Sequence, residues 1–144
     1  MKFANEIVRN QRSRSTDDYG SGQFGAPRKR KHGREPHAGL DIQARPGEEV
    51  FSPIKGEIVR EGFPYGDDLS FRYVVIRGVD KWSNYKIRLF YVEGLFSGKV
   101  APGAIVGRAQ NLILRYPMIT NHIHLEVSFH DRLLSPFEIY GQCF

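Results

Sequence analysis

Short apolar runs separated by proline and glycine fill the chain from about Leu40 onward, and they restrict its possible folds. The runs are rich in Val, Ile, Phe and Tyr and read LDIQA, EVFSP, GEIVREG, FRYVVIRG, YKIRLFYVE, AIVGRA and HIHLEVSF. Runs of this length, bounded by breakers such as Pro46-Gly47, Pro53 and Pro102-Gly103, are typical of β-strands. Strands this close together pair as antiparallel neighbours, because parallel pairs need long crossovers. The sequence therefore predicts an all-β fold, a single antiparallel β-sandwich or partly open barrel.

The first 20 residues are polar and lack a sustained period, so we expect an N-terminal arm over residues 1–20, either docked or mobile. We expect residues 1–15 to bring few apolar groups to the core. Residues 21–144 then form the folded domain.

The net charge of +5 lies in residues 1–36, which hold nine Lys/Arg against four Asp/Glu, while the remainder holds twelve of each. A neutral body argues against a nucleic-acid-binding surface on the folded domain.

No window of the sequence is apolar enough for a membrane span, and the N-terminus lacks the apolar region of a signal peptide. Cys143 is the only cysteine, which excludes an internal disulfide. We expect synthesis in a reducing cytoplasm, with later release or association with a virion. An extracellular location is expected instead if the chain is a trimmed form of a secreted protein.

Two histidines in the last apolar run, His122 and His124, are separated by Ile123. In a strand, residues i and i+2 face the same side, so both imidazoles project together while Ile123 enters the core. An isolated H-x-H pair is more often a pair of surface or core histidines than a metal site.

A second group, His37-Ala38-Gly39-Leu40-Asp41, lies just before the first strand run. Its spacing would suit a helix, but Pro36 and Gly39 argue against one. We expect Gly39 to let the backbone bend so that the imidazole of His37 and the carboxylate of Asp41 converge. Both are suitable zinc ligands, and three protein ligands plus water is the catalytic pattern. The alternative is a loop histidine and an aspartate that caps a turn.

Together, the two groups resemble the lysostaphin-type zinc endopeptidases, whose signature is H-x-G-x-D early and H-x-H late. The resemblance covers residues 22–136 and includes the segments GEEVFSPIKG and GAIVG. It implies one zinc ion bound by His37, Asp41 and His124. It also implies a catalytic role for His122 beside the metal.

Two further runs point to one branch of this family. GQFGAPR before the first motif and RYPMITN before the last resemble leukocyte-derived chemotaxin and its bacterial and bacteriophage relatives. The animal proteins of this branch are secreted and disulfide-bonded, whereas Thr16, Ser21 and the positions near Tyr85 and Val127 carry no cysteine here. This departure favours a microbial or viral protein, with virion proteins as expected partners.

One departure from the family bears on catalysis. Active members carry a histidine in a Y-x-H-L motif. The matching segment here, residues 91–95, has Glu93 in place of that histidine. A carboxylate can accept a proton, but it cannot donate to an oxyanion unless it is itself protonated. The resemblance therefore implies His122 and Glu93 as the catalytic pair and leaves turnover open.

Three functions follow from these observations. The first is a zinc metalloendopeptidase-like domain directed at the peptide cross-links of bacterial peptidoglycan, carried by a phage or prophage particle. The second is a non-proteolytic, zinc-stabilised binding or structural module resembling chemotaxin. The third and weakest is nucleic-acid binding by the basic arm.

Two groups of residues have open roles. The run Arg28-Lys29-Arg30-Lys31, with Arg34, is either a site for an anionic polymer or a solvated loop. The aromatic residues between Phe63 and Tyr91 are expected mainly in the core, with a peptide or glycan groove as the alternative.

Overall fold

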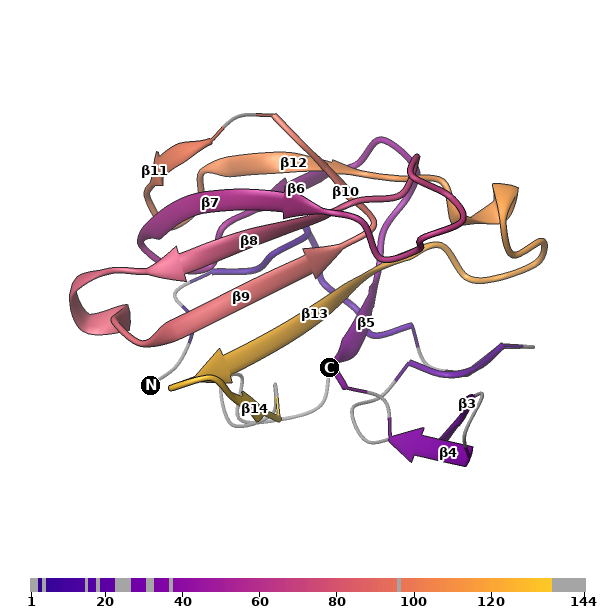
Figure 1. The fold of residues 1–144 in the computed structure, drawn as a ribbon. Helices are drawn as coiled ribbons and strands as arrows, with labels where there is room; N and C mark the ends of the chain where they lie inside the picture. Colours follow the sequence, from indigo (N-terminus) through magenta and orange to yellow (C-terminus); the bar gives the residue numbers. More distant parts are fainter. Residues whose placement is uncertain are drawn as a thin grey trace.

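Antiparallel strands make up almost all of the regular structure in the computed structural model, which describes residues 3, 5–14, 16–17, 19–22, 27–30, 33–36, 38–95 and 97–135. The large sheet has seven strands (Figure 1), in the order β11 (Gly98–Val100), β7 (Gly56–Gly62), β8 (Tyr73–Gly78), β9 (Tyr85–Phe90), β13 (His122–Phe129) and β14 (Arg132–Leu134), with β5 (Leu40–Gln43) also paired to β13. Strand β13 therefore has β9 along one edge and both β5 and β14 along the other.

A small three-stranded sheet lies across the large one, in the order β10 (Val92–Gly94), β12 (Ile105–Ala109) and β6 (Glu49–Phe51). Every pair in both sheets is antiparallel. Each of the seven runs singled out in the sequence contains a strand. The prediction of a single antiparallel all-β fold is confirmed, in its open, two-sheet form.

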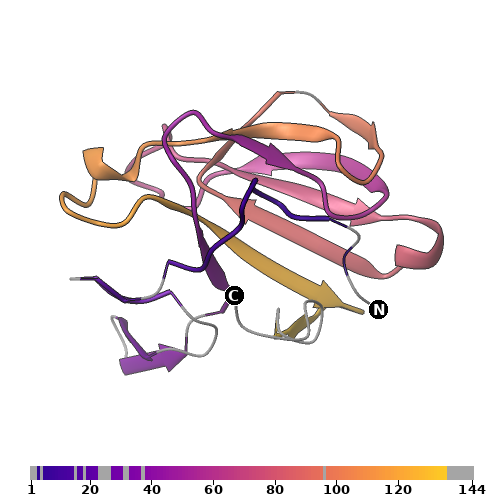
Figure 2. The ribbon, with the colours of Figure 1, turned by 180° about the vertical axis from the view of Figure 1, so that it is seen from behind.

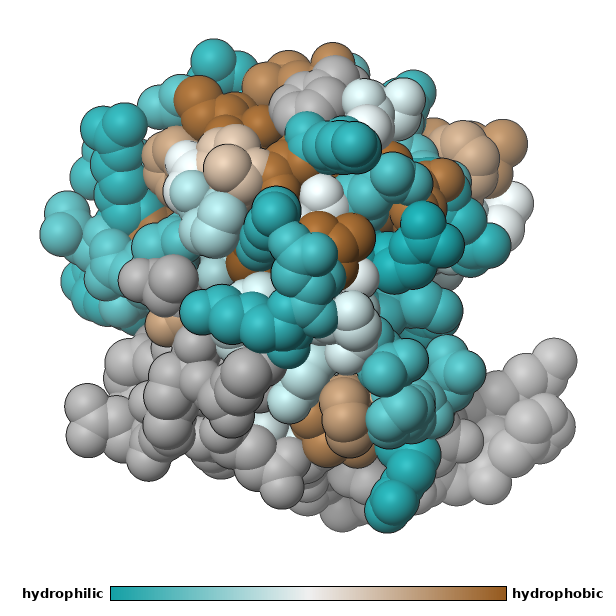
Figure 3. Space-filling view, turned by 90° about the vertical axis from the view of Figure 1, so that its left-hand side faces the viewer, coloured by the Kyte–Doolittle hydropathy of each residue, from teal (hydrophilic) through white to brown (hydrophobic). Residues whose placement is uncertain are grey.

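The remaining elements are short. Two small hairpins precede the sheets: β1 (Thr16–Asp17) with β2 (Gly20–Ser21), and β3 (Pro27–Arg30) with β4 (Gly33–Pro36). Two 3₁₀ turns, Asp80–Trp82 and Leu112–Leu114, lie in the connections. Over the part of the chain that the structure describes, no helix has the length and apolar character needed to cross a bilayer. On the face shown in Figure 3, hydrophilic residues predominate and hydrophobic ones lie in small separate groups.

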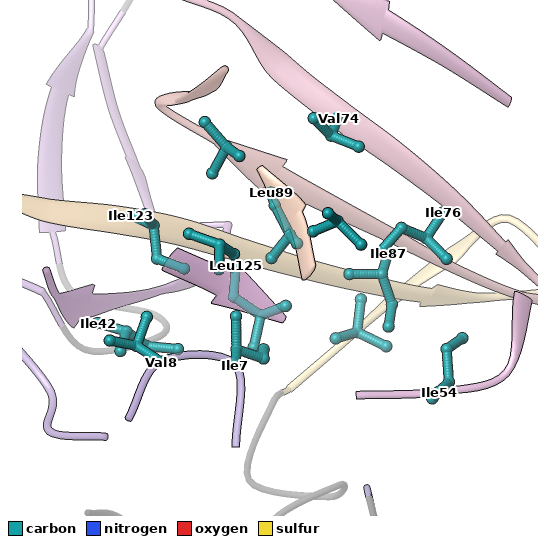
Figure 4. Close-up of a cluster of buried hydrophobic side chains, with 14 of the residues drawn as sticks. Ile7, Val8, Ile42, Ile54, Val74, Ile76, Ile87, Leu89, Ile123 and Leu125 are labelled. Carbon is teal, nitrogen blue, oxygen red and sulfur yellow. The ribbon is translucent and has the colours of Figure 1, made fainter. Parts of the chain in front are cut away.

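The core lies between the two sheets and follows the alternation of their strands. On β13 the side chains of Ile123, Leu125 and Val127 are fully buried, and they meet Ile87 and Leu89 of β9 (Figure 4). The placement of Ile123 in the core is thus as the alternation predicts. Burial of a Leu or Ile side chain is worth about 1.5–3 kcal/mol, so this layer fixes the register of β13. The opposite face of the same strand is free to carry the histidines.

The N-terminal segment is docked, which settles the choice left open by the sequence for its described residues. Ile7 and Val8 are 0% and 1% exposed and belong to the main core (Figure 4). Seen from behind, the segment runs beside β5 (Figure 2), where the backbone N–H of Gln43 donates to the carbonyl of Arg12. The expectation that residues 1–15 bring little to the core is therefore wrong.

Candidate metal centre

The pairing of β5 with β13 brings two of the predicted ligands together. Asp41 and His124 are direct partners in the register of these strands, so their side chains lie on the same face. His124 Nδ1 is 2.9 Å from Asp41 Oδ1. The other ring nitrogen, Nε2, is 3.0 Å from Oε1 of Glu126, two residues along β13. His124 is thus held between two carboxylates.

The charges around His124 determine its protonation. Burial alone would lower the pKa of this imidazole, but the hydrogen bonds to Asp41 and Glu126 outweigh burial and raise the pKa to about 9. In the absence of metal, both ring nitrogens therefore carry protons and donate to carboxylates. A metal ion competes with one of these protons for the nitrogen.

His122 lies on the same face of β13 but in a different electrostatic setting. Its Nδ1 is 2.8 Å from the carbonyl oxygen of Thr120, and its Nε2 is 3.4 Å from Asp41 Oδ2. Burial lowers the pKa of His122 in spite of the nearby Asp41. A neutral ring that donates Nδ1–H to Thr120 must carry its lone pair on Nε2. His122 therefore offers a base beside Asp41.

A buried arginine from the N-terminal segment holds the other side of Asp41. The side chain of Arg14 is 3% exposed; its Nη1 donates to Asp41 Oδ2 at 2.9 Å, and its Nε donates to Asp17 Oδ2 at 2.9 Å. Asp17 also accepts from the backbone N–H of Thr120 at 2.9 Å. Burial would raise the pKa of Asp17, but these donors hold it well below its usual range. A charged network thus joins the N-terminal segment to the start of β13.

Two glycines give this network its space. A Cβ on Gly22 would lie 2.7 Å from Cβ of Arg14 and 2.9 Å from Cβ of Asp41. A Cβ on Gly39 would lie 2.1 Å from the carbonyl oxygen of Leu125 and 2.8 Å from His124 Nε2. Gly39 is not among the residues with positive φ. The chain bends at Ala38 and Gly39, as expected, and Gly39 also lets the His124 ring approach the backbone closely. The convergence of His37 with Asp41 stays a prediction.

The two predicted ligand atoms that the structure describes, Asp41 Oδ1 and His124 Nδ1, are placed suitably for a zinc ion. Two ligands of a tetrahedral zinc, with bonds of about 2.0–2.1 Å, lie about 3.3 Å apart; Asp41 Oδ1 and His124 Nδ1, at 2.9 Å, need only a small shift to reach this separation. Glu126 on Nε2 supplies the carboxylate partner that metal-bound histidines usually have. Arg14 on Oδ2 leaves Oδ1 for the metal. The fit favours one-oxygen coordination by Asp41.

The third predicted ligand, His37, lies outside the described residues and stays a prediction. Within the described ranges, no group of three His, Cys, Asp or Glu side chains is assembled to hold a metal. The described site therefore contains two predicted ligands, Asp41 and His124, and the predicted catalytic histidine, His122.

An open pocket of about 380 Å³ adjoins this cluster. Its polar floor contains Asp41, His122 and His124, and its walls are mostly aromatic. The wall residues are Tyr19, Tyr65, Phe90, Tyr91 and Tyr116, with Pro64, Leu112 and Ile119. The expectation that the aromatic residues are mainly core therefore holds for Phe71 and Trp82, which are buried. Tyr65 and Tyr91 pack against the smaller core cluster and also line the pocket. These two form a groove wall, which was the alternative.

The structure does not bring Glu93 to the pocket. Its side chain is exposed on β10, opposite Arg108 of β12 in the register, and it is not among the pocket-lining residues. The break lies at Tyr91, whose φ of 66° separates β9 from β10. A bulky residue in this region costs of order 1–3 kcal/mol. This left-handed residue carries the Tyr91 ring to the pocket.

The described part of the basic run, Arg28 to Arg30 with Arg34, belongs to the β3–β4 hairpin. The backbone of β3 contains Arg28, Lys29 and Arg30, and Lys29 is the register partner of Arg34 in β4. Lys31 lies outside the described residues. A site for an anionic polymer stays a prediction.

Sequence reasoning missed three residues of the cluster. Glu126 had a signal, because the period of two that pairs His122 with His124 continues to position 126. Arg14 and Asp17 had none, since their polar stretch shows no pattern.

Comparison with known proteins agrees with this architecture. No protein-family model matches the chain. Leukocyte cell-derived chemotaxin-2 of Mus musculus is 29% identical over 127 residues, which are 87% of this chain and 75% of that protein. Myeloid protein 1 of Gallus gallus is 32% identical over 115 residues, 78% of this chain but 34% of that protein.

Solved structures share the fold. A zinc-containing peptidase from Vibrio cholerae superposes with a TM-score of 0.65 at 23% identity, over 93% of this chain and 39% of that one. Lysostaphin superposes with a TM-score of 0.60 at 19% identity, over 90% of this chain and 53% of that one. The chain thus spans about two fifths of the Vibrio protein and about half of lysostaphin. The chain therefore has the fold of the lysostaphin-type peptidases, and its sequence is similar to leukocyte cell-derived chemotaxin-2.

Proposed function

We propose that this protein is a zinc-dependent endopeptidase-like domain that hydrolyses peptide cross-links of the bacterial cell wall. The observation that carries the proposal is the position of a neutral His122, whose Nε2 lies 3.4 Å from Asp41 Oδ2 and whose side chain lines the same pocket as His124. A base, two metal ligands and a substrate-sized groove then meet at one place.

The residues of the chain have separate tasks in this reaction. His37, Asp41 and His124 would hold a zinc ion, which would polarise the scissile carbonyl and lower the pKa of a water molecule. His122 accepts a proton from the attacking water at Nε2 while the carbonyl of Thr120 keeps Nδ1–H in place. As the C–N bond breaks, the same proton passes to the leaving amine. Glu126 holds the ring of His124 throughout.

The cell-wall substrate is inferred from likeness and from the basic hairpin. The Vibrio protein is a zinc-containing peptidase, and this chain shares its fold. We place the domain on a phage or prophage particle, because the sequence lacks the cysteines of the animal branch.

Anionic wall polymers are the partner we propose for the β3–β4 hairpin. Replacing Arg28 and Lys29 by Gln should make retention of the protein on such a polymer weaker and less salt-dependent.

A second function has its own support. Glu93 lies outside the pocket, so the family's second histidine has no counterpart there among the described residues, and the similarity to chemotaxin is substantial. A zinc-stabilised module would bind a peptide or glycan in the aromatic pocket without cleaving it.

The deciding experiment measures the amino groups released from purified peptidoglycans with several cross-bridge types. Zinc-loaded protein should release amino groups, and chelation should stop the release. His122→Asn should abolish release while keeping about one zinc per chain, since His122 is a base and not a ligand. His130→Asn is the matched control, because His130 is exposed and lies outside the pocket.

Two results separate the candidates. If zinc-loaded wild type releases nothing from any cross-bridge type but still binds wall fragments, the binding module replaces the peptidase. If His122→Asn loses its zinc together with its activity, the assignment of His122 as base is wrong.

A further inference from the structure

Tyr91 is a bulky residue in the left-handed region, with φ of 66°. Its backbone is fixed on both sides: its N–H donates to the carbonyl of Arg72 at 2.7 Å, and its carbonyl accepts from the N–H of Gln110 at 2.8 Å. Its ring stands edge-on to the ring of His122, with centroids 5.7 Å apart. Strained residues that their surroundings hold firmly are concentrated at functional sites. The phenol of Tyr91 is therefore delivered to the pocket at a structural cost.

The hydroxyl of Tyr91 is the end of a chain of three phenols. Tyr65 Oη is 3.0 Å from Tyr91 Oη and 2.8 Å from Tyr116 Oη. At the far end, Arg115 Nε donates to Tyr116 Oη at 3.3 Å, and the Arg115 guanidinium lies 3.8 Å above the Tyr65 ring. This row of hydrogen-bonded phenols thus begins at the permanent cation of Arg115 and ends at Tyr91, beside His122.

Hydrogen counting shows what this chain can do. Three phenols carry one hydrogen each, and the two bonds between them use two. One hydrogen is left for a ligand. Tyr116 already accepts from Arg115, and hydroxyl dipoles near a cation turn their hydrogens away from it, so Tyr116 donates to Tyr65 and Tyr65 donates to Tyr91. The unused hydrogen is then on Tyr91.

We infer that the hydroxyl of Tyr91 is a hydrogen-bond donor to an oxygen of the bound ligand, either a peptide carbonyl or the tetrahedral oxyanion formed from it. This inference rests on the proposed function and deepens it. It supplies the donor that Glu93, exposed on β10, does not bring to the pocket. A chain of aligned hydrogen bonds strengthens its last donor, and the groove thereby selects ligands with a partly or fully anionic oxygen.

Two further features keep Tyr91 a donor. Burial raises its pKa to about 12, so the phenol stays protonated at neutral pH. Phe71 meets the rings of Tyr65 and Tyr91 edge-on, with centroids 5.8 and 6.2 Å away. This packing restricts the two rings to the arrangement in which their oxygens meet.

The test compares two ligands on the zinc-loaded protein by calorimetry. The first is a phosphinic pseudopeptide, which carries a tetrahedral anionic centre, and the second is the plain peptide of the same sequence. Tyr91→Phe should lower phosphinate affinity by about 10-fold to 100-fold, the usual range for a hydrogen bond to a charged group. It should change plain-peptide affinity much less. The tyrosine difference spectrum produced by phosphinate should also shrink.

Controls guard against a folding effect. Tyr73→Phe removes a phenol hydroxyl that bonds to Arg60 and lies outside the pocket, and it should leave both affinities unchanged. Tyr65→Phe keeps Tyr91 but interrupts the chain, and it should give a smaller loss than Tyr91→Phe. Melting temperatures and zinc content should stay equal across the set.

The outcomes distinguish this inference from the proposed function. Equal phosphinate affinity in wild type and Tyr91→Phe, or no phosphinate binding by wild type, overturns the inference. A wild type that releases no amino groups, but whose phosphinate affinity still depends on Tyr91, retains the donor and loses the peptidase.

Discussion

At the scale of single residues, the cluster depends on one buried cation. Arg14 offsets the charges of Asp17 and Asp41, and all three side chains are at most 12% exposed. Removing one partner of such a group leaves charges buried without compensation, which typically costs 3–5 kcal/mol. The arginine also sets which oxygen of Asp41 remains for a metal. Stability and metal affinity therefore share one side chain.

Arg14→Met is expected to lower the free energy of unfolding of the zinc-free protein by about 3–5 kcal/mol, measured by urea denaturation at neutral pH. Adding Asp17→Asn should recover part of the loss, because one orphaned carboxylate becomes neutral. Arg12→Met, at an exposed position two residues earlier, should change the free energy of unfolding by about 0.5 kcal/mol or less. A loss in Arg14→Met no larger than in Arg12→Met would contradict the role of the buried pair.

At the scale of elements, the N-terminal segment behaves as part of the domain. Its backbone bonds to β5 and β6: Phe51 N–H donates to the carbonyl of Ile7, and Arg14 N–H donates to the carbonyl of Asp41. Its aromatic end packs on the 3₁₀ turn, with the rings of Phe3 and Trp82 5.6 Å apart. The segment therefore covers the core and also positions Arg14.

Ile7→Ala is expected to destabilise the protein by about 2–5 kcal/mol, the range for emptying a fully buried isoleucine site. Val59→Ala is a suitable control, since Val59 is 40% exposed on β7. Thermal melting of both variants gives the comparison. A docked but dispensable arm would instead leave the Ile7→Ala melt at the wild-type temperature.

At the scale of the whole molecule, a metal at this site would join distant parts of the chain. The predicted ligands Asp41 and His124 come from strands 83 positions apart, and Asp17 meets Thr120 across 103 positions. A ligand that binds only the folded state stabilises it by mass action. We therefore expect zinc to stabilise the whole fold rather than one loop.

Chelation is expected to lower the melting temperature of wild type. At free zinc 1,000 times the dissociation constant, the stabilisation lost is about 4.1 kcal/mol. His124→Asn should melt at the same temperature with and without chelator, while His130→Asn should respond as wild type does. An unchanged wild-type melt, with removal of the zinc verified by elemental analysis, would contradict a structural role for the metal.

The sequence predicts the strands well and the site only in part, for physical reasons. Hydrophobic alternation and turn residues are signals carried by neighbouring positions, so strands β5, β7 and β13 can be predicted from the sequence. The shared face of His122 and His124 can be predicted in the same way. Arg14 reaches Asp41 through tertiary packing, and polar residues without a period carry no signal for such a contact. The turn at Tyr91 is likewise unpredictable, because a left-handed tyrosine has no sequence signature.

The order in which β5 and β13 are synthesised determines when the cluster around Asp41 can form. Asp41 and Arg14 leave the ribosome early, but His122 and His124 belong to β13, near the end of the described chain. A nascent chain cannot form the Asp41–His124 pair before residue 124 has been added. A chain that stops before β13 contains Asp41 and Arg14 but lacks the strand that brings His122 and His124 beside them.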